Sequence, residues 1–359
     1  MFIEYSSDAV KNSGHSVLRK SLDYSCTAMR DGTHVVCTEN RDVAERICSI
    51  MSAEQHIYRF FDRIHEYFAQ IACVKNEVDV FVRIISGTSS PKVKKMRDKK
   101  KVISIGIQQT LNEYFWRETT FVTENTVDYD AYKIIVAQSN PLGIRVKSYS
   151  QNGGGTTTAA VIKNLITENR FILCMVDSDR HYPGDKLGET AKKVVKIAKD
   201  TPLCCVDIIS SLEIENLFLT EGIICCLYGG HSFPEYKKII DSLRSARLFH
   251  GDIGFFYDVK KGYVYKKIRG NHYLLTSFQN DIQDCGRNMS KCDCKECDNF
   301  VIKGLGSDFL FEVVNKDDIV TEIQKNYSFF PEHIKAEWQR IARIVLSWCC
   351  ANRLEVLGV

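Results

Sequence analysis

Proline is scarce in this chain, and long apolar runs are missing. Only 6 of the 359 residues are proline, which excludes long proline-rich linkers. The longest apolar stretches, Phe171 to Val176 and Leu217 to Leu227, are too short or too interrupted to span a bilayer. The first residues, MFIEYSSDAVKNSG, lack a basic segment followed by an apolar one, so no secretory signal is expected. We therefore expect a cytoplasmic protein with no membrane partner.

A strong excess of one charge sign is also absent. The 48 basic and 45 acidic side chains leave a formal net charge of +3, so overall charge does not indicate a nucleic-acid-binding protein. Hydrophobic residues make up 44% and charged residues 26%, which excludes a wholly disordered or collagen-like chain. The length favours two domains, with one large domain or three small ones as alternatives.

Cysteine, in contrast, is frequent. Most of the 15 cysteines, including the adjacent pairs at 204–205, 225–226 and 349–350, are expected to be reduced and buried, because no secretory signal precedes them. One group has the spacing C-x6-C-x-C-x2-C, which supplies four thiolates for a structural Zn²⁺ site. Free thiols, or disulfides formed on purification, are the alternative. The four residues are Cys285, Cys292, Cys294 and Cys297.

The first part of the chain, residues 1–117, is predicted to be a separate α/β or mainly helical domain for partner docking or nucleic-acid contact. A strand is expected at His34–Cys37, and a strand or short helix at Val78–Ile85. Apolar residues recur at helical spacing from Ile57 to Ile71, which predicts a helix facing the core.

A strongly basic segment, KVKKMRDKKK, follows the loop at 87–91. Seven of its ten residues are lysine or arginine and one is acidic, so it cannot pack into a core. Either it contacts phosphates, each neutralised phosphate releasing a counterion, or it forms a solvated linker or helix face. The candidate nucleic-acid contacts are Lys92, Lys94, Lys95, Arg97, Lys99, Lys100 and Lys101.

Strand and helix patterns alternate from about residue 119, and a catalytic domain is expected over 118–245. Single helices between strands indicate a mostly parallel, Rossmann-like sheet flanked by helices. One predicted strand, Phe171–Val176, is apolar throughout, as expected for a strand covered on both faces. The predicted strands are 119–123, 144–149, 171–176 and 203–209, and the predicted helices are 130–137, 156–169 and 187–198.

A C-terminal extension, residues 246–359, is expected to follow. Its first part resembles a β-hairpin, with strands at Phe255–Tyr257 and Tyr263–Ile268, and the cysteine group comes next. Apolar residues from Trp338 to Cys349 recur at helical spacing, which predicts a terminal helix facing the core.

Acidic residues follow three of the predicted parallel strands. The carboxyl ends of parallel strands meet at one edge of a sheet, so these side chains are expected to converge. Mg²⁺ and Mn²⁺ prefer hard oxygen ligands, and such ions can clamp the attacking and leaving oxygens of a phosphoryl displacement. The candidate metal ligands are Glu124, Asp128, Asp177, Asp179, Glu213 and Glu215.

In order and context these acids resemble the TOPRIM domain shared by topoisomerases, bacterial primases and the overcoming-lysogenization-defect nucleases. Glu124 matches the catalytic glutamate of that domain, and Asp177 with Asp179 matches its D-x-D. In the nuclease branch a second acid follows one helical turn later, as Asp128 does here. That branch also has an acid after the next strand, for which Glu215 is preferred over Glu213. The resemblance covers roughly residues 118–230.

The resemblance implies a metal-dependent endonuclease with a basic group beside the scissile phosphate. Lys303 is taken as that group, with Lys260, Lys261, Lys266 and Lys267 as alternatives. Two departures stand out: Asn125 replaces the usual glycine after the catalytic glutamate, and RHYPG follows the D-x-D.

No G-x-x-x-x-G-K-[ST] motif occurs, so the ATPase that precedes the TOPRIM domain in overcoming-lysogenization-defect proteins is missing. A stand-alone protein of this size resembles the nuclease subunits of phage-defence systems. That resemblance implies a DNA or RNA substrate, tRNA included, a separate ATPase or other defence-system partner, and a homo-oligomer as one arrangement. Two other functions are left open: a D-x-D nucleotide-sugar transferase, and a non-catalytic nucleic-acid-binding or assembly subunit with a decayed site.

Overall fold

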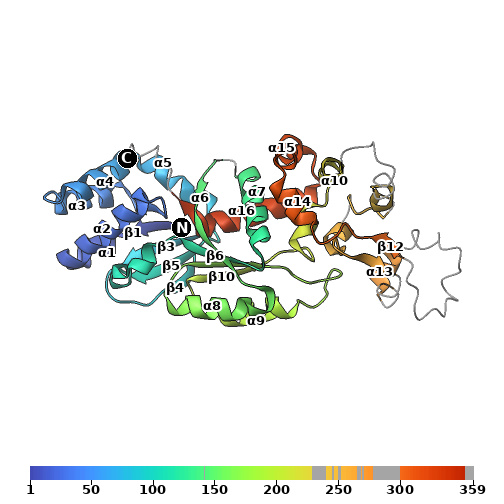
Figure 1. Cartoon of the computed structure of the whole chain (residues 1–359). Helices are drawn as coiled ribbons and strands as arrows, with labels where there is room; N and C mark the ends of the chain where they lie inside the picture. The colour runs from blue at the N-terminus through green and yellow to red at the C-terminus, as the bar shows by residue number, and fades with distance from the viewer. Residues whose placement is uncertain are drawn as a thin grey trace.

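The computed structural model describes residues 1–140, 142–228, 240–244, 246–249, 252–264, 268, 271–277 and 300–351. Two sheets, each made mostly of parallel strands, lie along an elongated molecule (Figure 1). The N-terminal region is at one end, and α10, α14, α15 and β12 lie towards the other. The predicted zinc ligands Cys285, Cys292, Cys294 and Cys297 lie outside the described residues. The described cysteines, including the three adjacent pairs, are free thiols.

The N-terminal region forms a five-stranded sheet in the order β2-β1-β3-β5-β4. All neighbours are parallel except β4, which is antiparallel to β5. The region is thus α/β, one of the two predicted alternatives. Its strands are β1 (Phe2–Tyr5), β2 (Val35–Thr38), β3 (Val80–Ile85), β4 (Lys92–Lys95) and β5 (Lys101–Gly106). Its helices are α1 (Ser7–Asn12), α2 (His15–Arg30), α3 (Arg41–Ile50), α4 (Gln55–Glu66), α5 (Phe68–Ala72) and α6 (Val74–Glu77), followed by the 3-10 turns η1 (Ile107–Leu111) and η2 (Glu113–Trp116).

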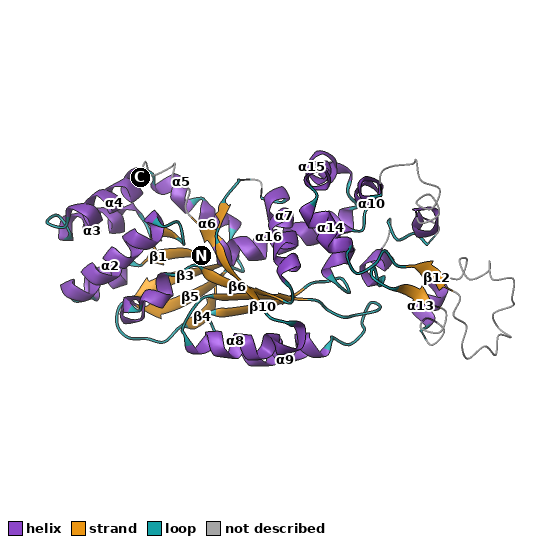
Figure 2. Ribbon diagram, viewed as in Figure 1, coloured by secondary structure: helices purple, strands orange, loops and turns teal. Residues whose placement is uncertain are grey.

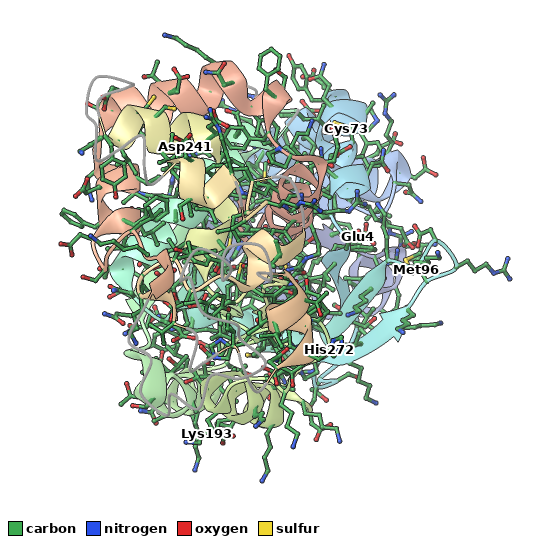
Figure 3. The ribbon with its side chains drawn as sticks, turned by 90° about the vertical axis from the view of Figure 1, so that its right-hand side faces the viewer. Glu4, Cys73, Met96, Lys193, Asp241 and His272 are labelled. Carbon is green, nitrogen blue, oxygen red and sulfur yellow. The ribbon has the colours of Figure 1, made fainter. Side chains whose placement is uncertain are left out.

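The basic segment is a β-hairpin and not a linker or helix face. Lys92 to Lys95 form the edge strand β4, and Lys101 begins β5. Met96, in the turn between them, projects from the body of the molecule (Figure 3). Most of the basic side chains are exposed, whereas Lys100 is partly buried and its Nζ donates a hydrogen bond to the Lys75 carbonyl oxygen.

The second sheet has the order β10-β9-β6-β8, and every neighbouring pair is parallel. The predicted alternation of strands and helices is present, although the strand expected at 144–149 divides into two. The elements are β6 (Thr119–Thr123), α7 (Thr126–Gln138), β7 (Arg145–Val146), β8 (Ser148–Asn152), η3 (Gly155–Thr157), α8 (Thr158–Thr167), β9 (Ile172–Val176), α9 (Glu189–Ala198) and β10 (Cys204–Ile208).

Strand β9 is covered on both faces, as its apolar sequence predicts. Alternate residues point to opposite faces of a strand. Ile172 and Cys174 pack with α8 and α9, whereas Leu173 and Met175 belong to the larger core on the other side. Helices α8 and α9 lie below the sheet in Figure 2, and α7 and α16 (Glu332–Cys349) lie above it.

Helix α16 connects the two sheets. It packs against α7, and its Arg343 Nε lies 2.7 Å from Asp79 Oδ1, just before β3. Ser347 Oγ accepts a hydrogen bond from the Asp79 backbone nitrogen at 2.8 Å. The chain then forms β13 (Cys350–Ala351), which pairs with β7. The predicted apolar stripe from Trp338 to Cys349 is buried.

The hairpin predicted around residues 255–268 is wrong. Phe255 and Phe256 lie in a 3-10 helix, η6 (Asp252–Phe256), and β11 (Gly262–Val264) pairs instead with β12 (Phe300–Lys303). Gly262 has φ +70° and approaches the backbone of residues 302–304, where no side chain would fit. The remaining elements are η4 (Ile214–Phe218), α10 (Glu221–Leu227), α13 (His272–Ser277), α14 (Phe309–Asn315), α15 (Asp317–Asn326) and η9 (Tyr327–Phe329).

None of the helices in the described ranges combines the length and apolar character that crossing a bilayer requires.

Candidate functional site

The carboxyl ends of β6, β9 and β10 open into one cavity of about 490 Å³. The structure brings all six acids predicted from the sequence to its lining. These acids come from segments up to 91 residues apart, counted from Glu124 to Glu215. The acidic lining residues are Glu124, Asp128, Asp177, Asp179, Glu213, Glu215 and Asp308.

The first acidic pair follows β6 and begins α7. Asn125 caps α7 in a capping box, in which its backbone nitrogen donates to Asp128 Oδ2 at 2.8 Å. Capping satisfies N–H groups that lack partners in the first turn of a helix, so Asn125 has a local role in starting α7. The Glu124 backbone oxygen accepts from Gly154 at 3.2 Å, and Glu124 Oε1 accepts from the Asp177 backbone nitrogen at 3.3 Å.

The D-x-D turns sharply at the end of β9. Asp177 Oδ1 accepts from the Ile214 backbone nitrogen at 3.0 Å, whereas Ser178 is buried between the two aspartates. Asp179 has φ 54°, in the left-handed region, and also lines the cavity. Its carboxylate lies against Gly188, where an added Cβ would collide with Asp179 Oδ2. Gly188 therefore leaves the space that the second aspartate occupies.

The third acidic segment leaves β10 and forms η4. Glu213 is the N-cap of η4 in a capping box with Asn216. Asn216 Nδ2 donates at 2.7 Å to both the Gly254 and Tyr257 carbonyl oxygens, which ties this turn to the segment before β11. Glu215 is 4% exposed, and its buried Oε2 has no hydrogen-bond partner among the residues that the structure describes.

One lysine lines the cavity among the described residues, and it is Lys260. Its Nζ lies 2.9 Å from Glu215 Oε1 and 3.2 Å from Glu213 Oε2. Lys303, the lysine favoured from the sequence, is exposed and does not line this cavity. Lys261 is exposed as well. Lys266 and Lys267 lie outside the described residues.

Negative charge is only partly compensated in the cavity. Burial, with repulsion from Glu215 and Glu124, raises the pKa of Asp177 well above its usual range. Burial raises the pKa of Asp128 to about 7. Burial is also the main cause of the raised pKa of Glu124, Asp179 and Glu213. Burial opposes the charge on Lys260, but Glu215 and Glu213 raise its pKa overall. A bound cation would relieve this repulsion.

The chemical type of the ligand atoms in the cavity suits a hard divalent cation. Carboxylate oxygens are the ligands that Mg²⁺ and Mn²⁺ prefer, and within the described part of the chain Glu215 Oε2 has no hydrogen-bond partner. In their present positions, however, no three histidine, cysteine, aspartate or glutamate side chains of the described residues are arranged to hold a metal ion. Lys260 neutralises part of the charge of Glu213 and Glu215 instead. Metal binding therefore requires these carboxylates to rearrange within the cavity.

The contribution of α14 and the residues just before it to this cavity was not predicted from the sequence. Ser307, Asp308, Leu310 and Phe311 line it, although they follow the parallel sheet by about a hundred residues. An available signal was the segment GLGSD before an apolar run, because glycine followed by Ser-Asp often precedes a helix.

No protein-family model, no curated protein and no solved structure matches this chain. Function is therefore inferred from the chemistry of the cavity.

Proposed function

We propose that this protein is a metal-dependent nuclease with a TOPRIM-like site. The observation that supports the proposal is the lining of one cavity by acids from the ends of three neighbouring parallel strands, together with a lysine. Such a cavity suits a phosphodiester, whose negative charge needs cations and whose cleavage adds further charge. The defence role and the separate ATPase partner are proposed from the resemblance alone.

Five acids would hold Mg²⁺ or Mn²⁺ in this proposal. When bound, the ions supply Lewis-acid stabilisation of the charge that develops on the phosphate. The protein positions the ligands through backbone hydrogen bonds, from Asp177 to Glu124 and from Ile214 to Asp177. The proposed ligands are Glu124, Asp128, Asp177, Asp179 and Glu215, with Glu213 beside them.

Lys260 replaces Lys303 as the proposed basic group. Its ammonium is already held in the cavity by Glu213 and Glu215, so it can face a phosphate without a large movement of the chain. A fixed positive charge beside developing negative charge lowers the barrier because it costs no reorganisation during the reaction.

The basic hairpin is proposed as a contact for the phosphate backbone of DNA or RNA. Lysine and arginine side chains along β4 and its turn are exposed and can follow a phosphate chain without reading its sequence.

The direct test is incubation of the purified protein with plasmid, single-stranded DNA and tRNA in Mg²⁺, Mn²⁺ or EDTA, with and without the suspected partner. We expect cleavage with metal and a loss of at least about 100-fold in Asp177→Asn, which keeps the shape and the hydrogen bond from Ile214. Asp200→Asn, at an exposed position between α9 and β10, is the matched control. Equal behaviour of the wild type and Asp177→Asn on every substrate would refute the proposal.

The effect of replacing Glu124 distinguishes a nucleotide-sugar transferase from a nuclease. Such an enzyme needs only the D-x-D for its metal, so Glu124→Gln would leave it largely active. Glu124 lies within hydrogen-bonding distance of Asp177, which favours a site that uses both acids. We expect Glu124→Gln to inactivate the protein as Asp177→Asn does, and nucleotide sugars to leave its melting temperature unchanged.

A further inference from the structure

An aromatic ring stands exposed at the edge of the acidic cavity. Phe311, on α14, lines the cavity and is 56% exposed. Other apolar residues of the helix are buried: Phe309, Leu310 and Val313 are each at most 3% exposed. The buried apolar face of α14 is therefore complete without Phe311.

A phenylalanine at this position contradicts the amphipathic pattern of α14. The outward positions of such a helix usually carry polar residues, because exposed aromatic surface gains nothing from folding. A residue that breaks the amphipathic pattern of its helix is expected where that residue binds a ligand. In the described part of the chain, Phe329 is the other strongly exposed phenylalanine, at 83%, and it does not line this cavity.

The helix that carries Phe311 packs against elements that present proposed metal ligands. Helix α14 packs against α7, which begins beside Asp128, and against η4, which contains Glu215. Its Leu310 is buried and lines the same cavity. Phe311 therefore stands on a helix that contacts two of the elements that present the acids.

We propose that Phe311 stacks on an unpaired nucleobase beside the scissile phosphate, so that the substrate is single-stranded or locally unpaired nucleic acid. This inference rests on the proposed nuclease function. The acids and Lys260 suit the phosphate, and a flat apolar ring at the same opening suits a base, which is joined to that phosphate through one sugar. Stacking on an aromatic side chain requires a base whose face is free, and paired bases inside a duplex do not offer one.

The test is binding of a single-stranded oligonucleotide that contains 2-aminopurine, whose fluorescence falls when it stacks. Binding is measured with Ca²⁺ in place of Mg²⁺, and a duplex of the same sequence is measured beside it. We expect Phe311→Ala to weaken single-strand binding by roughly 5- to 100-fold and to abolish the quenching. Phe311→Trp should retain both, and Phe329→Ala, the matched control, should bind as the wild type does.

The outcomes separate this inference from the nuclease proposal. If no substrate is cleaved but the quenching depends on Phe311, the nuclease function fails and the stacking contact stands. If cleavage occurs but Phe311→Ala keeps full affinity and quenching, the stacking role is overturned. An equal loss of single-strand and duplex binding in Phe311→Ala overturns the preference for unpaired bases. Cleavage of single strands by Phe311→Ala should fall together with the lost affinity.

Discussion

The backbone nitrogen of Asp177 donates a hydrogen bond to Glu124 Oε1 at 3.3 Å, although 53 residues separate the two in sequence. This contact joins the ends of β6 and β9, which are neighbours in the sheet. It places the glutamate that follows one strand beside the D-x-D that follows another, as a shared metal site requires.

Metal binding should depend on Asp177 more than folding does. The pKa of Asp177 is raised by burial and by nearby acids, so in the metal-free protein asparagine resembles the protonated side chain. We expect Asp177→Asn to change the melting temperature of the metal-free protein by no more than about 2 °C. Mn²⁺ at about 100 times its Kd should stabilise the wild type by about 2.7 kcal/mol and the variant by far less. Differential scanning fluorimetry with and without Mn²⁺ measures both effects, and equal stabilisation of the two proteins would contradict the assignment.

The two candidate lysines should differ in their effect on cleavage. Lys260 contacts Glu213 and Glu215 in the cavity, whereas Lys303 is exposed outside it. We expect Lys260→Met to reduce kcat by about 10²- to 10³-fold, because a fixed positive charge is lost. Lys303→Met should stay within about threefold of the wild type, which is the scale of a surface change. The reverse order of effects would restore the interpretation drawn from the sequence.

The basic hairpin should control the salt dependence of nucleic-acid binding. Lys94, Lys95 and Arg97 are exposed on β4 and its turn, so their replacement by alanine should not disturb a core. Each lost phosphate contact should lower the slope of log K against log salt by about 0.7 to 0.9. The matched control replaces three exposed lysines of α9 by alanine: Lys192, Lys193 and Lys196. Lys193 points to solvent (Figure 3). Titrations at several salt concentrations decide the matter, and an unchanged slope in the hairpin variant would exclude the contact.

A partly buried ion network should hold the turn after β10 in place. Arg340 bridges Asp207 at 2.9 Å and Glu337 at 2.8 Å, and Glu337 accepts hydrogen bonds from Ser210. Arg340→Met leaves two largely buried acids unpaired, so we expect a loss of about 2–4 kcal/mol in the free energy of unfolding, at the low end because Arg340 is partly exposed.

The matched control for this network is a double variant. Glu337→Gln combined with Arg340→Met removes one of the unpaired acids and should recover part of the loss in urea denaturation. A single variant as stable as the wild type would show that the network contributes little.

Stability in mild acid should depend on His34. The ring is fully buried between Trp116 and Phe171, and burial, with the positive N-terminus second, lowers its pKa well below the usual value. The unfolded chain takes up a proton on His34 near pH 6.5, while the folded protein does not. The contribution of His34 to the free energy of unfolding is therefore fully present above pH 6.5 and is lost as the pH decreases from that value.

Because of this residue, we expect the free energy of unfolding to decrease by up to about 1.4 kcal/mol for each pH unit below about 6.5. His34→Phe should flatten that part of the profile, whereas His15→Gln, at an exposed position, should leave it unchanged. Urea denaturation between pH 5 and pH 8 is the measurement, and equal slopes in wild type and His34→Phe would contradict the prediction.

Local pattern was sufficient for many of the elements and for the acids. The uninterrupted apolar run of β9, the helical spacing of α16 and the position of Glu124, Asp177 and Glu215 after strands are properties of short segments. The parallel order of the strands then brings their carboxyl ends to one edge, so the convergence of the acids could be predicted without coordinates.

Tertiary structure alone decided which distant groups complete the cavity. β11 pairs with β12 and not with the segment before it, because Gly262 permits close contact with the backbone near Lys303. Near that pairing, Lys260 enters the cavity while the side chain of Lys303 stays outside, and α14 brings Phe311 to the opening. Contacts between segments tens of residues apart depend on packing and chain direction, which no local periodicity records.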